Sequence, residues 1–149
     1  MQIMAVLNAG AVVLLAACGF LVAPSGSPAI DAYSGIPEID DGGSSDGAVY
    51  GPGNEPVVVW TDRGSTFAVV LWGSGSCPHV PASLDVISSH EISLIFEPDG
   101  DEFCTLDSSP FTHEFAVPAG ASDLPLTITL ALPAGPESLV IDRFVLADE

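Results

Sequence analysis

Residues 124–132 alternate strictly between apolar and other side chains, and this alternation constrains the fold more than any other feature of the chain. Leucine or isoleucine occupies every second position, and threonine fills two of the intervening ones. Successive side chains of a β-strand point to opposite faces of a sheet, so the pattern predicts a strand with one buried face. The apolar positions are Leu124, Leu126, Ile128, Leu130 and Leu132.

Further short segments have the same character, and no stretch shows a convincing helical period. Glycine, proline and aspartate separate these segments, as is typical of turns. Strands at this spacing predict an all-β domain over residues 55–149, built as a small antiparallel β-sandwich that is immunoglobulin-like in architecture. A small β-barrel is the alternative. The other expected strands are residues 57–60, 66–72, 83–88, 91–97, 103–106, 113–117 and 139–146.

The N-terminal part of the chain has a different composition. Residues 3–15 form an apolar run that only Asn8 and Gly10 interrupt, as in the hydrophobic region of a signal peptide. The run ends in Leu15-Ala16-Ala17-Cys18, which resembles the lipobox of bacterial lipoproteins. The resemblance is confined to about the first 18 residues. It implies that residues 1–17 are removed and that the thiol of Cys18 carries a diacylglyceryl group.

This resemblance implies a membrane-anchored protein on the extracytoplasmic face of a cell membrane. The alternative is an uncleaved anchor, because residues 3–23 are about long enough to span a bilayer. Residues 1–4 contain no lysine or arginine, although signal peptides usually carry such residues before the apolar run. We therefore expect an in-frame start upstream that supplies basic residues.

Residues 18–54 have the composition of a flexible acidic linker. The segment is rich in proline, glycine and serine, and it contains carboxylates without a single lysine or arginine. A segment of this kind buries too little apolar surface to offset the entropy lost on ordering. We expect it to be a disordered tether between Cys18 and the folded domain, with docking of short apolar pieces such as Ile36 and residues 48–50 on the domain as an alternative.

The charge of the chain restricts its partners. Twenty carboxylates face two arginines, Arg63 and Arg143, and the formal net charge is −18. Phosphate binding needs clustered basic residues, so this composition excludes nucleic acid as a partner. Anionic lipid headgroups should repel this acidic protein surface. Attachment to the membrane would therefore depend on the diacylglyceryl group of Cys18. The plausible partners are divalent ions and cationic or other envelope proteins, and we expect the protein itself to be a monomer.

Two cysteines remain once Cys18 is assigned to lipidation. Cys77 and Cys104 form an even pair in a chain expected to enter an oxidising compartment, so we predict a disulfide between them. In the chain-entropy model such a bridge stabilises the fold by roughly 3.5 kcal/mol.

Two groups of residues are candidate metal ligands. Three histidines, His79, His90 and His113, would suit zinc with a neighbouring glutamate as base, but they lie on separate segments and show no HExxH spacing. The acidic turn formed by Glu97, Asp99, Asp101 and Glu102 would suit weak calcium binding, and otherwise it is a solvated hairpin tip.

No segment singles out a catalytic residue. Residues 73–77 superficially resemble a nucleophile elbow, but they lack the GxSxG pattern and fit a glycine-rich loop better. The leading interpretation is a non-enzymatic binding or interaction module of the cell envelope, without a cofactor apart from weakly bound calcium. The alternatives are a small metal-assisted envelope hydrolase and a weak calcium-dependent adhesion module.

Overall fold

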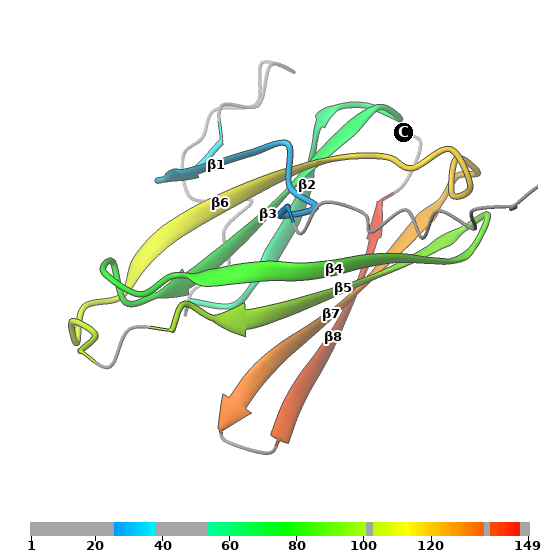
Figure 1. Cartoon of the computed structure of the whole chain (residues 1–149). Coiled ribbons are helices and arrows are strands. Elements are labelled where there is room, and N and C mark those ends of the chain that lie inside the picture. The colour runs from blue at the N-terminus through cyan, green and yellow to red at the C-terminus, as the bar shows by residue number, and fades with distance from the viewer. Residues whose placement is uncertain (1–25, 38–53, 101–102, 136–137, 147–149) are drawn as a thin grey trace, which may run out of the picture.

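The chain folds into two four-stranded β-sheets, shown in Figure 1 as a computed structural model. The structure describes residues 26–37, 54–100, 103–135 and 138–146, and these residues form no helix. The first sheet has the strand order β1-β6-β3-β2, and the second has the order β4-β5-β7-β8. The strands are β1 (Asp31–Ser34), β2 (Val57–Asp62), β3 (Thr66–Gly73), β4 (His79–Ser88), β5 (Glu91–Pro98), β6 (Ser109–Ala116), β7 (Leu126–Gly135) and β8 (Ser138–Leu146). The described strands do not close into a barrel, so the all-β sandwich prediction is confirmed.

The core lies between the two sheets and is built from the alternating residues of their central strands. Phe67, Phe96 and Phe115 meet there, with the ring centroids of Phe67 and Phe115 5.4 Å apart. Burial of such side chains contributes about 1.5–3 kcal/mol each. The predicted inward faces of residues 67–71, 92–96 and 126–130 are therefore correct. The fully buried aliphatic members of this core are Val69, Ile92, Leu94, Ala121, Leu126, Ile128 and Leu130.

The predicted hairpins are present as well. The turn between β2 and β3 is closed by the amide of Ser65, which donates to the carbonyl oxygen of Asp62 at 2.9 Å. Gly64 has a φ of 76°, which glycine adopts without the steric cost that a side chain brings. Strands β7 and β8 pair as antiparallel neighbours, as the turn at residues 133–136 predicts.

The second sheet is mixed, and this corrects the expectation of purely antiparallel sheets. Ile92 of β5 lies beside Ile128 of β7 in a parallel pairing. The strand between them in sequence, β6, belongs to the first sheet. The chain therefore crosses the sandwich and returns, which brings β7 back in the same direction as β5.

Strand β1 corrects the prediction that all of residues 18–54 form a flexible linker. It pairs antiparallel with β6, and Ala32 lies opposite His113. The hydroxyl of Tyr33 donates to Oε1 of Glu114 at 2.9 Å, and the buried hydroxyl of Thr112 donates to the carbonyl oxygen of Gly35 at 2.6 Å. These bonds offset the ordering entropy of a segment that has little apolar surface of its own.

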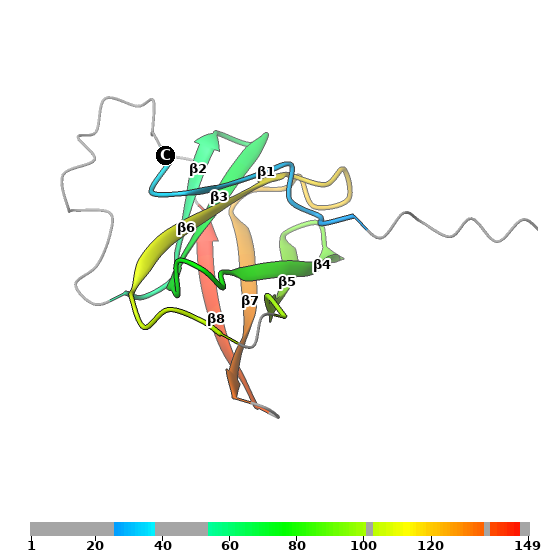
Figure 2. The same ribbon diagram turned by 60° about the vertical axis from the view of Figure 1, so that its left-hand side comes forward.

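The loops gather at two ends of the sandwich (Figure 2). The β3–β4 and β5–β6 loops share one end, where Gly73 pairs with Ser109 and His79 pairs with Pro98. The β4–β5 turn lies at the other end, where the amide of Asp123 donates to the carbonyl oxygen of Ser89. We call the first of these the disulfide end, because it contains both bridged cysteines.

Several sequence predictions fall outside the described residues. These are the signal peptide, the lipobox with Cys18, and the alternative membrane anchor at residues 3–23. Among the residues described, no helix is long and apolar enough to cross a membrane.

Candidate functional site

Cys77 and Cys104 form the predicted disulfide. Their sulfur atoms are 2.15 Å apart and their Cα atoms are 5.4 Å apart. Cys77 belongs to the loop between β3 and β4, and Cys104 belongs to the loop between β5 and β6. The bond therefore joins two loops at one end of the sandwich, unlike the immunoglobulin bridge, which crosses the core between strands.

Residues 103–108, which we call the 103–108 loop, carry the most exposed large apolar side chains at this end. Phe103 is 88% exposed and Leu106 is fully exposed. The prediction of a strand at residues 103–106 is wrong, because these residues form no ladder and bond to the neighbouring loop instead. Cys104 and Thr105, which lie between the two apolar residues, make the covalent and hydrogen-bonded attachments.

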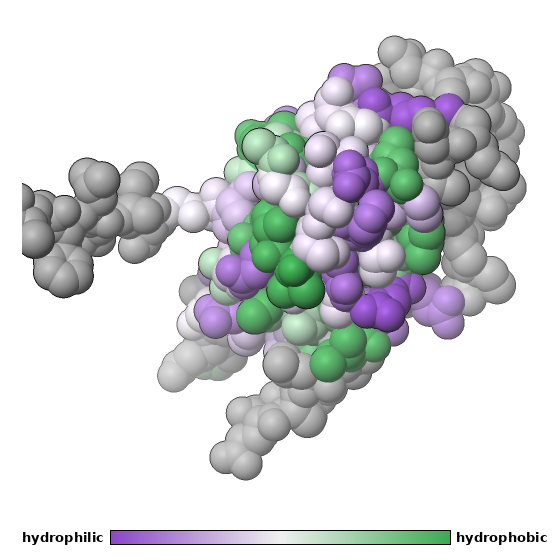
Figure 3. Space-filling view, turned by 90° about the vertical axis from the view of Figure 1, so that its right-hand side faces the viewer, coloured by the Kyte–Doolittle hydropathy of each residue, from purple (hydrophilic) through white to green (hydrophobic). Residues whose placement is uncertain are grey.

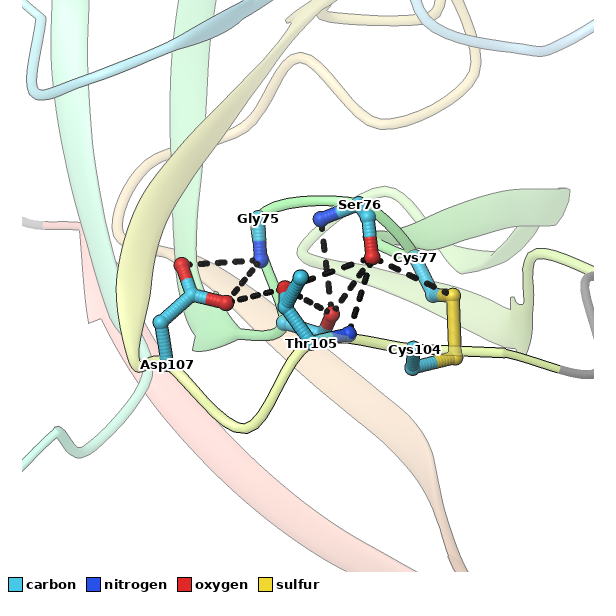
Figure 4. Close-up of a disulfide and its surroundings, with 7 residues drawn as sticks. Gly75, Ser76, Cys77, Cys104, Thr105 and Asp107 are labelled. Carbon is cyan, nitrogen blue, oxygen red and sulfur yellow. Dashed lines mark hydrogen bonds between the residues drawn. A yellow bond between two sulfur atoms is a disulfide. The ribbon is translucent and has the colours of Figure 1, made fainter.

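Hydrogen bonds hold the 103–108 loop against residues 74–77 (Figure 4). The amide of Thr105 donates to Oγ of Ser76 at 2.9 Å. Oγ1 of Thr105 lies 3.2 Å from Oγ of Ser76 and 2.9 Å from Oγ of Ser74. The serines of the supposed nucleophile elbow therefore have a structural partner, and residues 73–77 act as the glycine-rich loop that the sequence favoured.

Asp107 completes this arrangement. Its carboxylate accepts hydrogen bonds from Oγ of Ser109 at 2.6 Å, from Oγ1 of Thr105, and from the amide of Gly75 at 3.2 Å. These donors, with Ser109 the strongest, lower the pKa of Asp107 from 3.8 to about 2. A carboxylate with so low a pKa is a poor general base near neutral pH, so it is poorly suited to activate the neighbouring hydroxyls as nucleophiles.

Gly75 is required by the close approach of Asp107. A Cβ atom at Gly75 would lie 2.7 Å from Oδ2 of Asp107, which is closer than two such atoms pack. The absence of a side chain therefore allows the carboxylate to reach the backbone amide.

The histidines do not assemble as the zinc hypothesis requires. His113 is buried, and its Nε2 donates to the carbonyl oxygen of His79 at 2.8 Å. Burial is the main cause that lowers the pKa of His113, and burial also lowers the pKa of His79. His90 lies in the β4–β5 turn at the other end, with Nε2 3.9 Å from Oδ2 of Asp123. The length of β4 separates His79 from this turn. The three histidines therefore do not converge in one cleft, as the hydrolase hypothesis requires.

His113 is instead part of the packed interior. Its ring centroid is 5.1 Å from that of Phe111 and 5.4 Å from that of Phe96. Its Nδ1 atom has no hydrogen-bond partner among the described residues, which identifies the neutral form with the proton on Nε2. The following residue, Glu114, points to the opposite face of the sheet, as strand geometry predicts for each His-Glu pair.

The acidic candidate ligands are only partly described. Glu97 and Asp99 are exposed, and Asp101 and Glu102 lie outside the described residues. Among the residues that the structure describes, no group of three or more histidines, cysteines or carboxylates is placed to hold a metal ion. The amide of Asp99 donates to the carbonyl oxygen of Pro78, so Asp99 lies beside the disulfide.

A hollow lies between the residues that precede β2 and the edge strand β8. Its volume is about 290 Å³, and Glu55, Pro56, Asp142, Arg143 and Phe144 line it. The guanidinium of Arg143 is already engaged, because its Nη2 lies 2.7 Å from Oε1 of Glu91. The hollow therefore presents carboxylates without a free cation to orient an anionic ligand.

Sequence reasoning missed the residues that define the loop at the disulfide end. It treated Phe103 and Leu106 as strand residues, and it gave Thr105 and Asp107 no role. The available signal was the position of two large apolar residues on either side of a predicted disulfide cysteine, within an acidic segment. Comparison with protein-family models, with curated proteins and with solved structures finds no match for this chain.

Proposed function

We propose that the protein is a lipid-anchored, non-enzymatic binding module of the cell envelope. The lipobox-like motif supports anchoring through Cys18, with residues 1–17 removed. A disulfide between Cys77 and Cys104 fits a protein that folds in an oxidising compartment. The observation that carries the binding role is the 103–108 loop, which holds two large apolar side chains in water by covalent and hydrogen-bonded attachments.

The chemistry of the disulfide end favours binding over catalysis. Its hydroxyls are Ser74, Ser76, Thr105 and Ser109, and the carboxylate beside them has a pKa of about 2. Nucleophilic catalysis needs a base whose pKa lies closer to the working pH. Among the described residues, no third histidine or cysteine lies close enough to His79 and His113 to complete a metal site.

The anchoring is tested with the full chain expressed in a bacterium. We expect the wild-type protein in the membrane fraction, with an intact mass that begins at Cys18 and includes a diacylglyceryl group. We expect Cys18→Ala to retain residues 1–17 and to lose the lipid mass. The matched variant Cys77→Ala/Cys104→Ala removes the disulfide and should keep the lipid. A wild-type mass without lipid would refute the anchoring.

A further inference from the structure

The 103–108 loop is preorganised as a contact surface. The disulfide fixes Cys104, the amide of Thr105 is bonded to Ser76, and the carboxylate of Asp107 is bonded to Gly75 and Ser109. A side chain on a fixed backbone loses less conformational entropy on binding than one on a flexible loop. The exposed pair Phe103 and Leu106 therefore has what a binding hot spot needs: large apolar side chains on rigid supports.

Two of the other exposed apolar residues, both on β8, are arranged differently. Ile141 and Val145 of β8 are 68% and 61% exposed, and the ion-paired Arg143 lies between them on the same face of the strand. Figure 3 views the end of the sandwich opposite the disulfide, and its hydrophobic residues form separate groups among hydrophilic ones. Single exposed apolar residues of this kind are normal on protein surfaces.

The charge around the 103–108 loop defines the chemistry of its partner. Asp107 belongs to the loop, Asp99 lies beside Pro78, and Glu97 lies opposite Val80 near the end of β5. The two arginines of the chain lie elsewhere, in the β2–β3 turn and on β8. A ligand that complements this surface carries lysine or arginine together with apolar side chains.

The direction of β1 places the 103–108 loop away from the membrane. Strand β1 runs antiparallel to β6, and the amide of Ile30 donates to the carbonyl oxygen of Glu114. Glu114 follows Ser109 at the disulfide end by five residues, a distance of about 17 Å along the strand. The described chain therefore begins on the side of the molecule away from the disulfide loops (Figure 2).

The lipid anchor would lie close to that side. Seven residues, 19–25, separate Cys18 from Gly26, so the eight Cα–Cα steps between them reach at most about 28 Å. So short a connection favours presentation of the far end outward, so the anchoring bilayer is not the partner that we propose for the loop.

We propose that the 103–108 loop binds a protein segment that carries both apolar and cationic side chains, with Phe103 and Leu106 as the anchors. The outward orientation rests on the proposed lipid anchor, whereas the chemistry of the surface follows from the loop alone. The partner is thus a segment of another envelope protein, approached from the side away from the membrane.

A random peptide library tests this proposal. The target is the full-length protein in nanodiscs of zwitterionic lipid, with counter-selection on empty nanodiscs. We expect the enriched peptides to combine lysine or arginine with aromatic or aliphatic residues. Phe103→Ser/Leu106→Ser should weaken their binding at least about tenfold, as removal of hot-spot residues does. The matched variant Ile141→Ser/Val145→Ser, which removes two other exposed apolar residues, should bind as the wild type does.

The outcomes separate the two proposals. Failure to enrich peptides, or peptides that bind both variants equally, overturns the loop as a binding surface. Enriched peptides that are basic without apolar residues also overturn it, because they indicate attraction to the acidic surface in general. The lipid mass on Cys18 is measured on the same preparation, so loss of the anchor is recognised independently of peptide binding.

Discussion

Asp107 ties the 103–108 loop to its neighbour through an ionised carboxylate. Its hydrogen bonds to Ser109, Thr105 and Gly75 all favour the charged form, and they lower its pKa to about 2. A group whose pKa is lower in the folded state contributes stability above its unfolded pKa. For Asp107 this contribution is complete above about pH 4 and is lost as the pH falls from 3.8 through about 2.

The pH dependence of unfolding tests the role of Asp107. Asp107→Asn should flatten the loss of stability of the folded protein between pH 4 and pH 2, because the variant has no carboxylate to protonate there. Ser109→Ala should raise the pKa of Asp107 by removing its strongest donor. Carboxyl-carbon NMR titration measures that pKa directly, and an unchanged value in Ser109→Ala would disprove the assignment.

The close approach of the Asp107 carboxylate to Gly75 predicts a steric effect of substitution at Gly75. A methyl group at Gly75 would lie 2.7 Å from Oδ2 of Asp107, so Gly75→Ala should push the carboxylate away from the amide. We expect a lower free energy of unfolding than in the wild type, because the hydrogen bond between the amide of Gly75 and the carboxylate of Asp107 is weakened. Gly100→Ala is the matched control, because no atom lies within 4 Å of its added Cβ. Equal stability of the two variants would show that the approach is not constrained.

His113 titrates in a different pH range. Burial lowers its pKa below the ordinary value of 6.5, so the folded state holds the neutral ring while the unfolded state takes up a proton. Stability that depends on His113 should therefore fall as the pH drops below about 6.5. His113→Gln keeps a donor for the carbonyl oxygen of His79 and removes the titration. Urea unfolding from pH 7 to pH 5 should show a smaller loss for the variant, and an identical slope would contradict this account.

At the scale of elements, β5 and β7 show what the sequence could predict. Ile92, Leu94 and Phe96 are buried, whereas the intervening Ser93 and Ile95 are only partly buried, so the strand has one fully buried face. The period-two rule locates such strands because burial of one face repeats every second residue. Their parallel pairing was not predictable in the same way, because it depends on β6 crossing to the other sheet.

The structures of two elements could not be predicted from the local sequence pattern. Strand β1 has four residues, DAYS, and its stability comes from bonds to Glu114 and Thr112 more than 70 residues away. The 103–108 loop contains apolar residues that are exposed, so hydrophobicity wrongly indicated a strand. The disulfide could be predicted from cysteine number, whereas the hydrogen bonds that fix the loop depend on tertiary structure.

Hydrogen exchange tests whether β1 is an integral strand. The amides of Ile30 and Gly35 donate to β6 carbonyl oxygens at 2.8 and 2.9 Å and should be protected. Thr112→Val leaves the carbonyl oxygen of Gly35 without its hydroxyl donor, so it should speed exchange at both amides and cost about 1 kcal/mol of stability. Thr127→Val on β7 is the control and should leave both amides protected. Rapid exchange in the wild type would restore the linker interpretation.

At the scale of the whole molecule, pairing of β1 with β6 changes how the proposed lipid anchor would hold the domain. A disordered segment over residues 18–54 would let the domain turn freely above the membrane. With β1 docked, only residues 19–25 separate Cys18 from the described chain. The net charge of −18 adds repulsion from anionic headgroups and favours an arrangement that extends away from the surface.

Energy transfer to the membrane tests the central claim, a lipid-anchored module that displays its disulfide end outward. The full-length protein is placed in vesicles containing acceptor lipids, with a donor on an unnatural amino acid at Gly26 or at Leu106, both exposed positions. We predict strong transfer from position 26 and clearly weaker transfer from position 106. Equal transfer from the two positions, or stronger transfer from position 106, would contradict the orientation, and no transfer from either would contradict the anchor.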